Sequence, residues 1–322
     1  MSLASRAERR RRPLSDEQID RLRAAVDPRA TGASARPLVG GIDTATYALR
    51  LERDGQAREV VVRVYRGWDG ADDASTAARR MYGVLTAVAA VSAVVPRPLL
   101  ADPAGDLIGE PLVVMSFLPG APQPSTGQDD GWTEQLADAM ARVHATPLSG
   151  LPDDFPRLGS PEERLARWLR RAGDVHDPLW DKIVSTLTPI APHVRPNPLT
   201  LIHGDFWFGN TIWEDGRLTG IIDWDAAAIA DPARDVAGAR NDLALLSGAR
   251  AADVFLARYE SVRGPLRDLA FSDLMSSLAP TLWLHHWVEG YTALGLDLPL
   301  AVARARLEAW AEDAIGRLGR NV

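Results

Sequence analysis

Residues 201–210, LIHGDFWFGN, bring a histidine, an aspartate and an asparagine close together. These residues are His203, Asp205 and Asn210, with aromatic residues between the last two. A carboxylate can accept the proton of a reacting hydroxyl, and carboxylate and amide oxygens are ligands that Mg²⁺ prefers. Asp and Asn are also common turn residues, and a histidine often bonds only to backbone, so each residue alone is weak evidence of catalysis.

A β-hairpin is predicted directly after Asn210. In the segment TIWEDGRLTGIID, Asp215–Gly216 suits the two central positions of a type I′ turn. Continuing the register from this turn pairs Asn210 with Ile221. Asn210 and Asp223 then become diagonal neighbours about 7–8 Å apart at the backbone, a span that two oxygen-bearing side chains can close around one hard cation.

Asp205 precedes this hairpin, so the sequence predicts two carboxylates and an amide on converging segments. Phosphoryl transfer needs metal ligands that neutralise the phosphates and a carboxylate that orients the attacking hydroxyl. The combination favours this function over a structural turn, because chance must also place Asp223 correctly after the hairpin. A hydrolytic metal centre built on His203 and Asp205 is a further reading, but the remaining histidines show no convincing ligand spacing.

The segment HGDFWFGN, followed by IIDWD, resembles the signature of the aminoglycoside phosphotransferase family, a choline-kinase-like group with a protein-kinase-like fold. The resemblance extends from about Pro37 onward and is strongest over residues 201–235. It implies an α+β fold of two lobes: a small N-terminal lobe with an antiparallel sheet and a larger, mainly helical C-terminal lobe. It also implies that Asp205 is the catalytic base and that Asn210 and Asp223 are Mg²⁺ ligands.

The resemblance also assigns a nucleotide site to the first lobe. The segment PLVVMSFLPG corresponds to the hinge that holds adenine through backbone groups, and the glycines near residue 40 correspond to the loop over the phosphates. The residues assigned to the nucleotide in these two segments are Gly41, Thr44, Ser116, Phe117 and Leu118.

Arg63, in the run VVVRVYR, stands where the family usually offers a lysine to the ATP phosphates. Arginine keeps the positive charge and can bind a phosphate group through two hydrogen bonds. The family pattern also leads us to expect a glutamate partner on the next helix, but no Glu occurs between Glu59 and Glu110. Either one of the aspartates nearby orients Arg63 or the pair is absent; these are Asp69, Asp72 and Asp73.

Hydrophobic periodicity and turn residues predict the elements that position these groups. In the first lobe we expect a helix at 15–26 capped by Ser15, strands in TATYALRLER and REVVVRVYR joined at Asp54–Gly55, a helix at 72–91 and a buried strand within 111–120. Later helices include 133–145 and one opened by a capping box at 160–163. The expected divisions are a flexible basic arm at 1–14, a nucleotide-binding lobe at 15–119 and a helical lobe at 120–322.

The helical lobe of this family supplies the acceptor pocket, where a cationic aminoglycoside would need acidic groups. Asp242, Asp273 and Glu289 are candidates for them. Trp283 and Trp287 lie four residues apart and are predicted to share a helix face, either as core residues or as a flat wall for the acceptor. The residues that we assign to the acceptor are Trp207, Asp225, Trp287 and Glu289.

Three further aspartates follow Asp223 in the segment DWDAAAIADPARD. Asp225 is expected to touch the metal or the acceptor. Asp231 and Asp235 are expected to have structural roles, capping a turn and a helix.

The amino-acid composition limits the cellular location and the partners that we expect for the chain. Its 322 residues carry a net charge of −7, contain no cysteine and include a single lysine, Lys182. The absence of cysteine excludes disulfides and thiolate metal sites, and the negative charge disfavours a nucleic-acid partner. The basic N-terminus lacks the apolar run of a secretory signal, and the apolar run at 84–95 is too short to span a bilayer. We therefore expect a cytoplasmic monomer or homodimer that binds neither nucleic acid nor membrane.

These features predict an enzyme that uses Mg²⁺ and ATP, with GTP as an alternative donor, to phosphorylate a hydroxyl of a small molecule. The acceptor is expected to be an antibiotic, such as an aminoglycoside or a macrolide, or a metabolite, such as a sugar or an amino alcohol. The missing glutamate motivates an alternative, a pseudokinase-like protein that binds nucleotide without phosphoryl transfer. A kinase of protein substrates ranks third, because no activation segment is evident after Asp223.

Overall fold

The chain divides into two compact units. The first comprises the chain up to Pro119 with residues 150–153 and 223–225, and the second comprises the remainder. The computed structural model describes residues 12–38, 44–66, 73–92, 94–123, 129–173 and 175–320.

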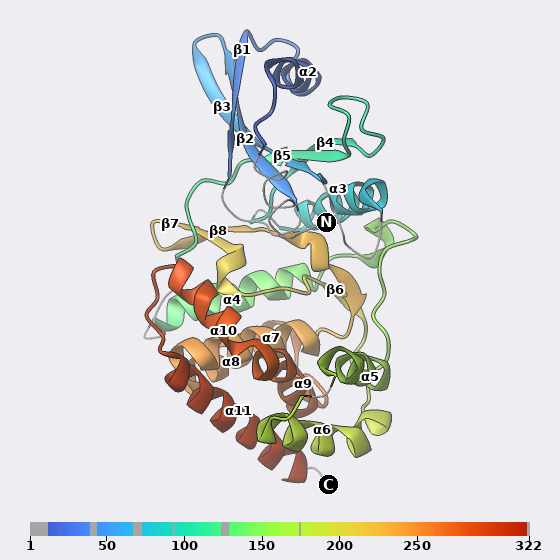
Figure 1. Cartoon of the computed structure of the whole chain (residues 1–322), viewed down its shortest axis with the longest axis vertical. Coiled ribbons are helices and arrows are strands. Elements are labelled where there is room, and N and C mark those ends of the chain that lie inside the picture. The colour runs from blue at the N-terminus through green and yellow to red at the C-terminus, as the bar shows by residue number, and fades with distance from the viewer. Residues whose placement is uncertain are drawn as a thin grey trace. The chain divides into compact units, whose positions relative to one another are not determined.

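The first unit is built on a five-stranded antiparallel sheet with the order β1-β2-β3-β5-β4 (Figure 1). Its strands are β1 (Gly32–Pro37), β2 (Ala45–Arg53), β3 (Gln56–Val64), β4 (Pro98–Asp102) and β5 (Leu112–Ser116). Asp54 and Gly55 join β2 to β3 with φ angles of 52° and 75°, the left-handed pair that a type I′ turn requires. The predicted strands joined at Asp54–Gly55 and the predicted strand within 111–120 are therefore confirmed, while β4 is a strand that the sequence pattern did not reveal.

Two helices of the first unit begin at side-chain caps. Helix α2 (Asp16–Val26) opens with a capping box in which Ser15 Oγ accepts from the Gln18 N–H at 3.2 Å and Gln18 Oε1 accepts from the Ser15 N–H at 3.1 Å. Helix α3 (Ala74–Ala89) begins after Asp73, whose carboxylate accepts from the Thr76 N–H at 2.9 Å. The predicted cap at Ser15 is confirmed.

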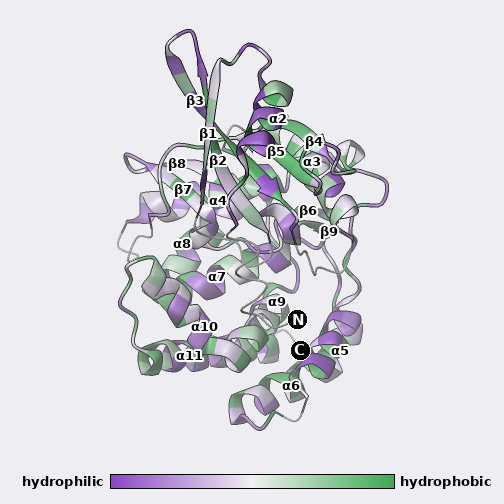
Figure 2. Ribbon diagram, turned by 45° about the horizontal axis from the view of Figure 1, so that its top comes forward, coloured by the Kyte–Doolittle hydropathy of each residue, from purple (hydrophilic) through white to green (hydrophobic). Residues whose placement is uncertain are grey.

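The core of the first unit lies between the sheet and α2. Apolar side chains from several strands are fully buried there, and Figure 2 shows hydrophobic residues in green along the sheet. Part of the segment expected to be an arm also packs into this unit, because Leu14 is buried and the Tyr47 hydroxyl donates to the Arg12 carbonyl at 2.6 Å. Burial of these apolar side chains is the main stabilising contribution to such a small sheet.

The second unit consists mainly of helices (Figure 1). They are α4 (Asp130–Val143), α5 (Pro161–Ala172), α6 (Pro178–Ile190), α7 (Ala233–Ser247), α8 (Ala249–Arg263), α9 (Leu269–Ser276), α10 (Leu278–Ala293) and α11 (Leu300–Arg320). Helix α7 packs against α8, α9 and α11, and α4 packs against α8. Helix α5 opens with the predicted capping box, formed by Ser160 and Glu163.

Two short antiparallel sheets hold the polar segment identified in the sequence. One pairs β6 (Thr200–Ile202) with β9 (Ala228–Ala230), and the other pairs β7 (Thr211–Glu214) with β8 (Arg217–Ile221). The residues quoted as LIHGDFWFGN therefore run from β6, through a loop, to the start of β7.

The predicted hairpin forms, but its register differs by one residue from the prediction. Asp215 and Gly216 have φ angles of 49° and 74°, as a type I′ turn requires. The register then shifts at a bulge, where the Thr219 hydroxyl donates to the Ile212 carbonyl at 3.1 Å. As a result the Ile222 N–H donates to the Asn210 carbonyl at 2.9 Å, and the expected pairing of Asn210 with Ile221 is wrong.

Helix α10 does not present Trp283 and Trp287 as a matched pair on one face. The backbone at Trp283 is non-helical, with φ −136° and ψ 36°, so the helix is kinked there. Trp283 packs against Trp168 with ring centroids 6.0 Å apart, whereas Trp287 Nε1 donates to Asp242 at 3.0 Å. The expected shared face is therefore wrong, because the kink separates the two indoles.

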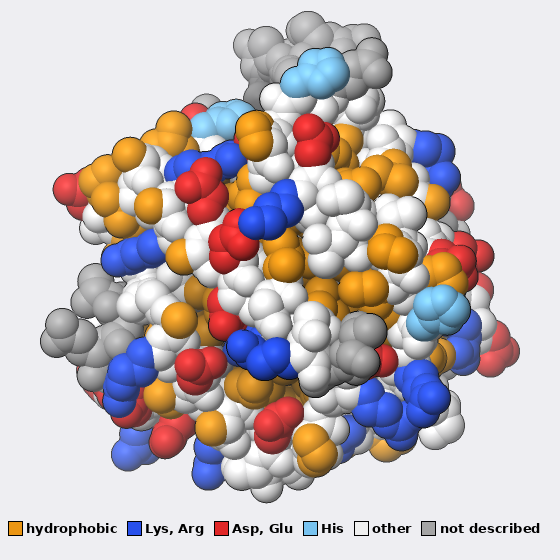
Figure 3. Space-filling view, turned by 90° about the horizontal axis from the view of Figure 1, so that it is seen from below, with side chains coloured by type: hydrophobic (Ala, Val, Ile, Leu, Met, Phe, Trp, Pro, Cys, Tyr) orange, Lys and Arg blue, Asp and Glu red, His pale blue; other side chains and the backbone are white. Residues whose placement is uncertain are grey.

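Charged side chains of both signs are interspersed on the face shown in Figure 3. Ion pairs link the neighbouring helices α6 and α11: Lys182 pairs with Glu312, and the Asp177 carboxylate accepts two bonds from Arg304, at 2.8 and 3.0 Å. Such partly exposed pairs contribute about 0–1 kcal/mol each. Among the described residues, no helix is long and apolar enough to cross a membrane.

Candidate active site

The loop after β6 is held by Asp235, which projects from the first turn of α7. Its carboxylate accepts from the backbone N–H groups of His203 at 2.6 Å and Gly204 at 2.9 Å. Burial alone would raise the pKa of Asp235, but a hydrogen bond and the nearby charge from His144 outweigh burial and lower it. Asp235 thus stays ionised, and it braces the loop instead of capping the helix as expected. Its role is structural, as predicted, but its partners lie 31 and 32 residues earlier in the chain.

Gly204 is required where the loop turns. Its φ angle is +83°, and a Cβ added there would lie 2.1 Å from the Ala226 carbonyl oxygen. A side chain would therefore meet both backbone strain and a direct clash. The glycine lets Asp205 follow immediately after the sharp turn.

His203 is fully buried and connects the loop to the end of the hairpin. Its Nε2 lies 2.9 Å from the Ile222 carbonyl, and its Nδ1 accepts from the Asp205 N–H at 3.3 Å. These partners assign the tautomer with the proton on Nε2. His203 acts through the backbone, consistent with a positioning role and not with a metal-ligand role.

Asp205 and Asn210 lie against each other at the two ends of this loop. The Asn210 Nδ2 donates to the Asp205 carbonyl at 2.9 Å and to its carboxylate Oδ2 at 3.0 Å. Within the described part of the chain, the Asn210 Oδ1 forms no hydrogen bond, so it can act as a ligand. The loop therefore presents an oriented carboxylate and an amide oxygen, the pair predicted from the spacing.

Asp223 follows Ile222, which is hydrogen-bonded to Asn210, and belongs to the first unit. Its φ angle is +66°, a left-handed conformation that is uncommon for a residue with a side chain. Strain of this kind concentrates at functional positions, where the surrounding structure holds it in place. No cluster of three or more His, Cys, Asp or Glu residues suited to a metal occurs among the described residues, so a cation here would also need amide or phosphate ligands.

The acidic partners of Arg63, a residue of β3, belong to the first unit. Its guanidinium donates to Asp223 at 3.0 Å and contacts the carboxylate of Asp225 as well. Burial lowers the pKa of Arg63, but the charges of Asp225 and Asp223 outweigh burial and raise it, so the side chain is cationic. Asp223 and Asp225 are therefore the acidic partners of Arg63. The expectation that one of the aspartates before α3 orients Arg63 is wrong for Asp73, which is the N-cap of that helix, while Asp69 and Asp72 lie outside the described residues.

The other residues assigned to the nucleotide have varied surroundings. Thr44 is buried at the start of β2, and its hydroxyl has no hydrogen-bond partner among the described residues. Ser116 ends β5, and its hydroxyl accepts from the Arg97 N–H at 2.9 Å. Phe117 and Leu118 follow directly after β5, outside any helix or strand. Gly41 lies outside the described residues.

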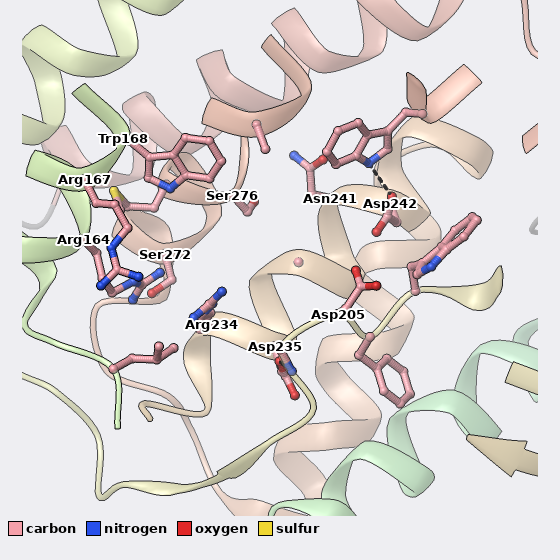
Figure 4. A pocket seen from close by; sticks show the side chains of 18 of the residues that line it. Arg164, Arg167, Trp168, Asp205, Arg234, Asp235, Asn241, Asp242, Ser272 and Ser276 are labelled. Carbon is pink, nitrogen blue, oxygen red and sulfur yellow. Dashed lines mark hydrogen bonds between the residues drawn. The ribbon is translucent and has the colours of Figure 1, made fainter. Parts of the chain in front are cut away.

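A cavity of about 460 Å³ lies in the second unit beside the loop that follows β6. Residues from α5, the loop, α7, α9 and α10 line it (Figure 4). They include Asp205, Trp207 and Trp287. Of the residues predicted for the acceptor, Trp207 and Trp287 therefore lie at the cavity. Glu289 does not line it: this exposed side chain lies 3.2 Å from His286. Asp225 contacts Arg63 in the first unit.

Asp242 on α7 also lines the cavity, close to Asp205 (Figure 4). Its carboxylate accepts from Trp287 Nε1 at 3.0 Å and from the Tyr291 hydroxyl at 2.8 Å. Burial raises its pKa to about 7, helped by the negative charge of Asp205. The other acidic candidate, Asp273, is fully buried between Arg240 and Arg317, so it is wrong as an acceptor residue.

Four arginines at the cavity were not recognised in the sequence: Arg164, Arg167, Arg171 and Arg234. The first two lie three residues apart on α5, a spacing that places them on one helix face. That spacing alone does not distinguish a cavity face from a solvated face, and Arg234 comes from a different helix.

A known protein family matches most of the chain. Residues 34–271 match the family described as "Phosphotransferase enzyme family". The chain belongs to this family. Its fold is the kinase-like α+β fold of that family, as predicted.

Curated relatives share parts of the chain. It is 33% identical over 162 residues to viomycin phosphotransferase of Streptomyces vinaceus, covering 44% of this chain and 54% of the relative. It is 31% identical over 119 residues to an aminoglycoside 3′-phosphotransferase of Escherichia coli, covering 32% and 42%. The chain thus spans about half the length, or less, of these relatives.

Solved structures match nearly the whole fold. Macrolide 2′-phosphotransferase of Brachybacterium faecium superposes with a TM-score of 0.60 at 20% identity, covering 88% of this chain and 92% of the other. A mutant aminoglycoside phosphotransferase bound to AMP-PNP and hygromycin B gives a TM-score of 0.60 at 18% identity, covering 92% and 98%. At these identities the likeness shows a shared fold.

Proposed function

We propose that the chain transfers the γ-phosphate of ATP to a hydroxyl group of a small molecule. The observation that carries this proposal is the Asp205 carboxylate, which lines the cavity and is oriented by Asn210 at 3.0 Å. Family membership and the relatives that phosphorylate antibiotics support the same reaction class. GTP is an alternative donor, and antibiotics and metabolites are both acceptor classes within this proposal.

In the proposed reaction the acceptor oxygen attacks the γ-phosphorus, and the bond from that phosphorus to the β–γ bridging oxygen breaks. ADP leaves, the phosphate monoester forms, and the hydroxyl proton passes to the Asp205 carboxylate. The bonds from Asn210 fix the direction of this carboxylate before the acceptor arrives. A positioned base of this kind contributes about 10²–10⁴-fold to the rate.

The donor set of the site suits Mg²⁺. Asn210 Oδ1 and the Asp223 carboxylate are hard oxygen ligands, and Mg²⁺ is commonly held by one or two side chains together with substrate phosphates. Asn210 and Asp223 would hold the ion, which would neutralise negative charge on the phosphates.

The first unit would bind the nucleotide. Arg63 would offset phosphate charge, and its raised pKa keeps it cationic. Backbone groups of Ser116, Phe117 and Leu118 would hold the adenine, while Gly41 and Thr44 would lie at the phosphates.

The test is phosphorylation of a pooled acceptor panel by the wild-type protein and Asp205→Ala, with ATP and Mg²⁺ and product detected by mass. We expect product from the wild type, about 10²–10⁴-fold less from Asp205→Ala, and unchanged nucleotide binding in both. Asp313→Ala, at an exposed position on α11, is the matched control and should behave as the wild type. Full turnover by Asp205→Ala would overturn the assignment.

A pseudokinase is the second candidate function. It is favoured by the placement of Arg63 between two aspartates, with no glutamate on α3 to position it. Mg²⁺-dependent ATP binding without product from any acceptor class would favour this alternative, whereas Asp205-dependent product would exclude it.

A further inference from the structure

The acceptor cavity carries a cluster of arginines on the side away from Asp242. Arg164 and Arg167 reach it from α5, and Arg234 reaches it from the first turn of α7 (Figure 4). In the described part of the chain, none of these three guanidinium groups forms an ion pair or a hydrogen bond. Arg304 shows the contrast, because its guanidinium is fully engaged by Asp177 and Glu308.

Holding these cations together is unfavourable in the absence of an anion. Burial, followed by the positive charge of Arg234, lowers the pKa of Arg164 to about 10. Burial likewise lowers the pKa of Arg234; the charges of Asp235 and Asp205 oppose this lowering, and the positive charge of Arg167 adds to it. Like charges in a partly desolvated site repel one another, and the nearby carboxylates do not outweigh burial and this repulsion, because the pKa values of Arg164 and Arg234 both remain lowered.

The neighbouring carboxylates are already committed to other groups. Asp235 accepts from the backbone of the catalytic loop and lies 3.3 Å from His144 Nε2. Asp231 accepts from Asn197 and from the Ala233 N–H. Neither forms an ion pair with an arginine of the cluster within the described residues, so the guanidinium groups face the cavity with their donors available.

The opposite side of the cavity has a different chemistry. Asp205 and Asp242 lie there (Figure 4), and Trp287, which donates to Asp242, also lines the cavity. With a pKa of about 7, the Asp242 carboxyl group is only partly ionised near neutral pH. A polycationic acceptor filling the cavity would meet the arginine cluster at one end, while an anionic acceptor would find a complementary charge there.

We propose that the acceptor is a hydroxylated organic anion whose carboxylate or phosphate group is bound by Arg164, Arg167 and Arg234 while its hydroxyl reaches Asp205. Guanidinium groups recognise both kinds of oxyanion through paired hydrogen bonds. A cavity of about 460 Å³ lies within the range that holds small organic ligands. The proposal rests on the proposed phosphotransferase function and specifies its acceptor class.

The transfer step is that of the proposed function. The acceptor hydroxyl oxygen bonds to the γ-phosphorus, ADP departs with the bridging oxygen, and Asp205 takes the proton. The anionic group of the acceptor stays bound to the arginines and forms or breaks no bond.

The first experiment measures anion binding directly. Inorganic phosphate is titrated calorimetrically into the full chain with Mg²⁺ and AMP-PNP present to fill the nucleotide site. We expect Arg164→Gln to raise the Kd about 10- to 100-fold, because one charge-assisted contact is lost. Arg170→Gln is the matched control, since Arg170 is an exposed residue of α5 outside the cavity lining. Equal phosphate affinity for wild type and Arg164→Gln, or no phosphate binding, would overturn the proposal.

The second experiment measures transfer to matched acceptors. The arms are hydroxycarboxylates, sugar phosphates, their uncharged amides or parent sugars, and aminoglycosides. We expect product in one of the two anionic arms, which identifies carboxylate or phosphate, and a higher KM with similar kcat for Arg164→Gln. Transfer only to uncharged or cationic acceptors, with no effect of Arg164→Gln, would overturn this inference and leave the kinase intact. Arg164-dependent phosphate binding without transfer in any arm would support the anion site and count against the kinase.

Discussion

The loop at residues 203–210 and the arginine cluster line the same cavity but are built in opposite ways. In the loop, hydrogen bonds from Asp235, His203 and Asn210 fix the polar groups around Asp205. In the cluster, Arg164 and Arg234 are partly buried without a partner among the described residues. The loop is therefore stabilised by the protein itself, whereas the proposal assigns the partner of the cluster to a ligand. Substitutions in the loop should cost much more stability than substitutions in the cluster.

The largest loss of stability is expected for Asp235→Ala. It leaves the buried N–H groups of His203 and Gly204 without an acceptor, which costs about 3–5 kcal/mol. Urea unfolding measures the loss. Asp138→Ala, which removes the partly exposed partner of Arg258, is the control and should cost about 1 kcal/mol or less. Equal costs for the two variants would show that Asp235 does not brace the loop.

Gly204→Ala is expected to cost about 3 kcal/mol, because it combines left-handed backbone strain with a clash. The comparison is Gly216→Ala in the hairpin turn, where φ is +74° and an added Cβ meets nothing within 4 Å. That variant carries the strain alone, about 1–2 kcal/mol. Thermal and urea unfolding of both proteins check the difference, and a Gly204→Ala cost no larger than that of Gly216→Ala would contradict the tight approach to Ala226.

Asp242 should make stability depend on pH. Its carboxyl has an ordinary value of 3.8 and a pKa of about 7 in the folded protein, so the folded state binds more protons between these values. Its contribution to the free energy of unfolding is fully present below about pH 4 and is lost as pH rises to about 7, an effect of up to about 4 kcal/mol. Asp242→Asn should remove this part of the pH dependence of the free energy of unfolding. The variant should also be more stable than the wild type at pH 8. Parallel wild-type and variant profiles from urea unfolding between pH 4 and 8 would contradict the assignment.

The smallest change in stability is expected for Arg164→Gln. Because Arg164 has no partner among the described residues, its removal should change the free energy of unfolding by about 0.5 kcal/mol or less, or raise it slightly. Arg170→Gln on the same helix should give a similar value. A loss of more than about 2 kcal/mol for Arg164→Gln alone would show that the cluster is part of the protein core.

Features controlled by neighbouring residues were predictable from the sequence. The capping boxes at Ser15 and Ser160, the type I′ turns and the spacing of Asp205 and Asn210 depend on a few adjacent residues. The bulge at Thr219 was not predictable, because turn chemistry fixes the register only near the turn.

Features that depend on distant parts of the chain escaped prediction. The partners of Arg63 lie 160 and 162 residues away, and the arginine cluster joins two helices separated by several elements. The periodicity of α5 shows that Arg164 and Arg167 share a face, but only tertiary packing decides that this face borders a cavity. The kink at Trp283 likewise reflects packing that a regular helical spacing does not reveal.

Single-turnover transfer from γ-labelled ATP most directly tests the claim that the loop performs the chemistry while the arginines bind the acceptor. Wild type, Asp205→Ala and Arg164→Gln would be compared by rapid quench with Mg²⁺ and a saturating anionic acceptor. We expect Asp205→Ala to lose the transfer step while still binding nucleotide, and Arg164→Gln to reach a rate close to wild type at a higher acceptor concentration. An undiminished rate for Asp205→Ala, or a rate for Arg164→Gln that no acceptor concentration restores, would contradict this division of roles.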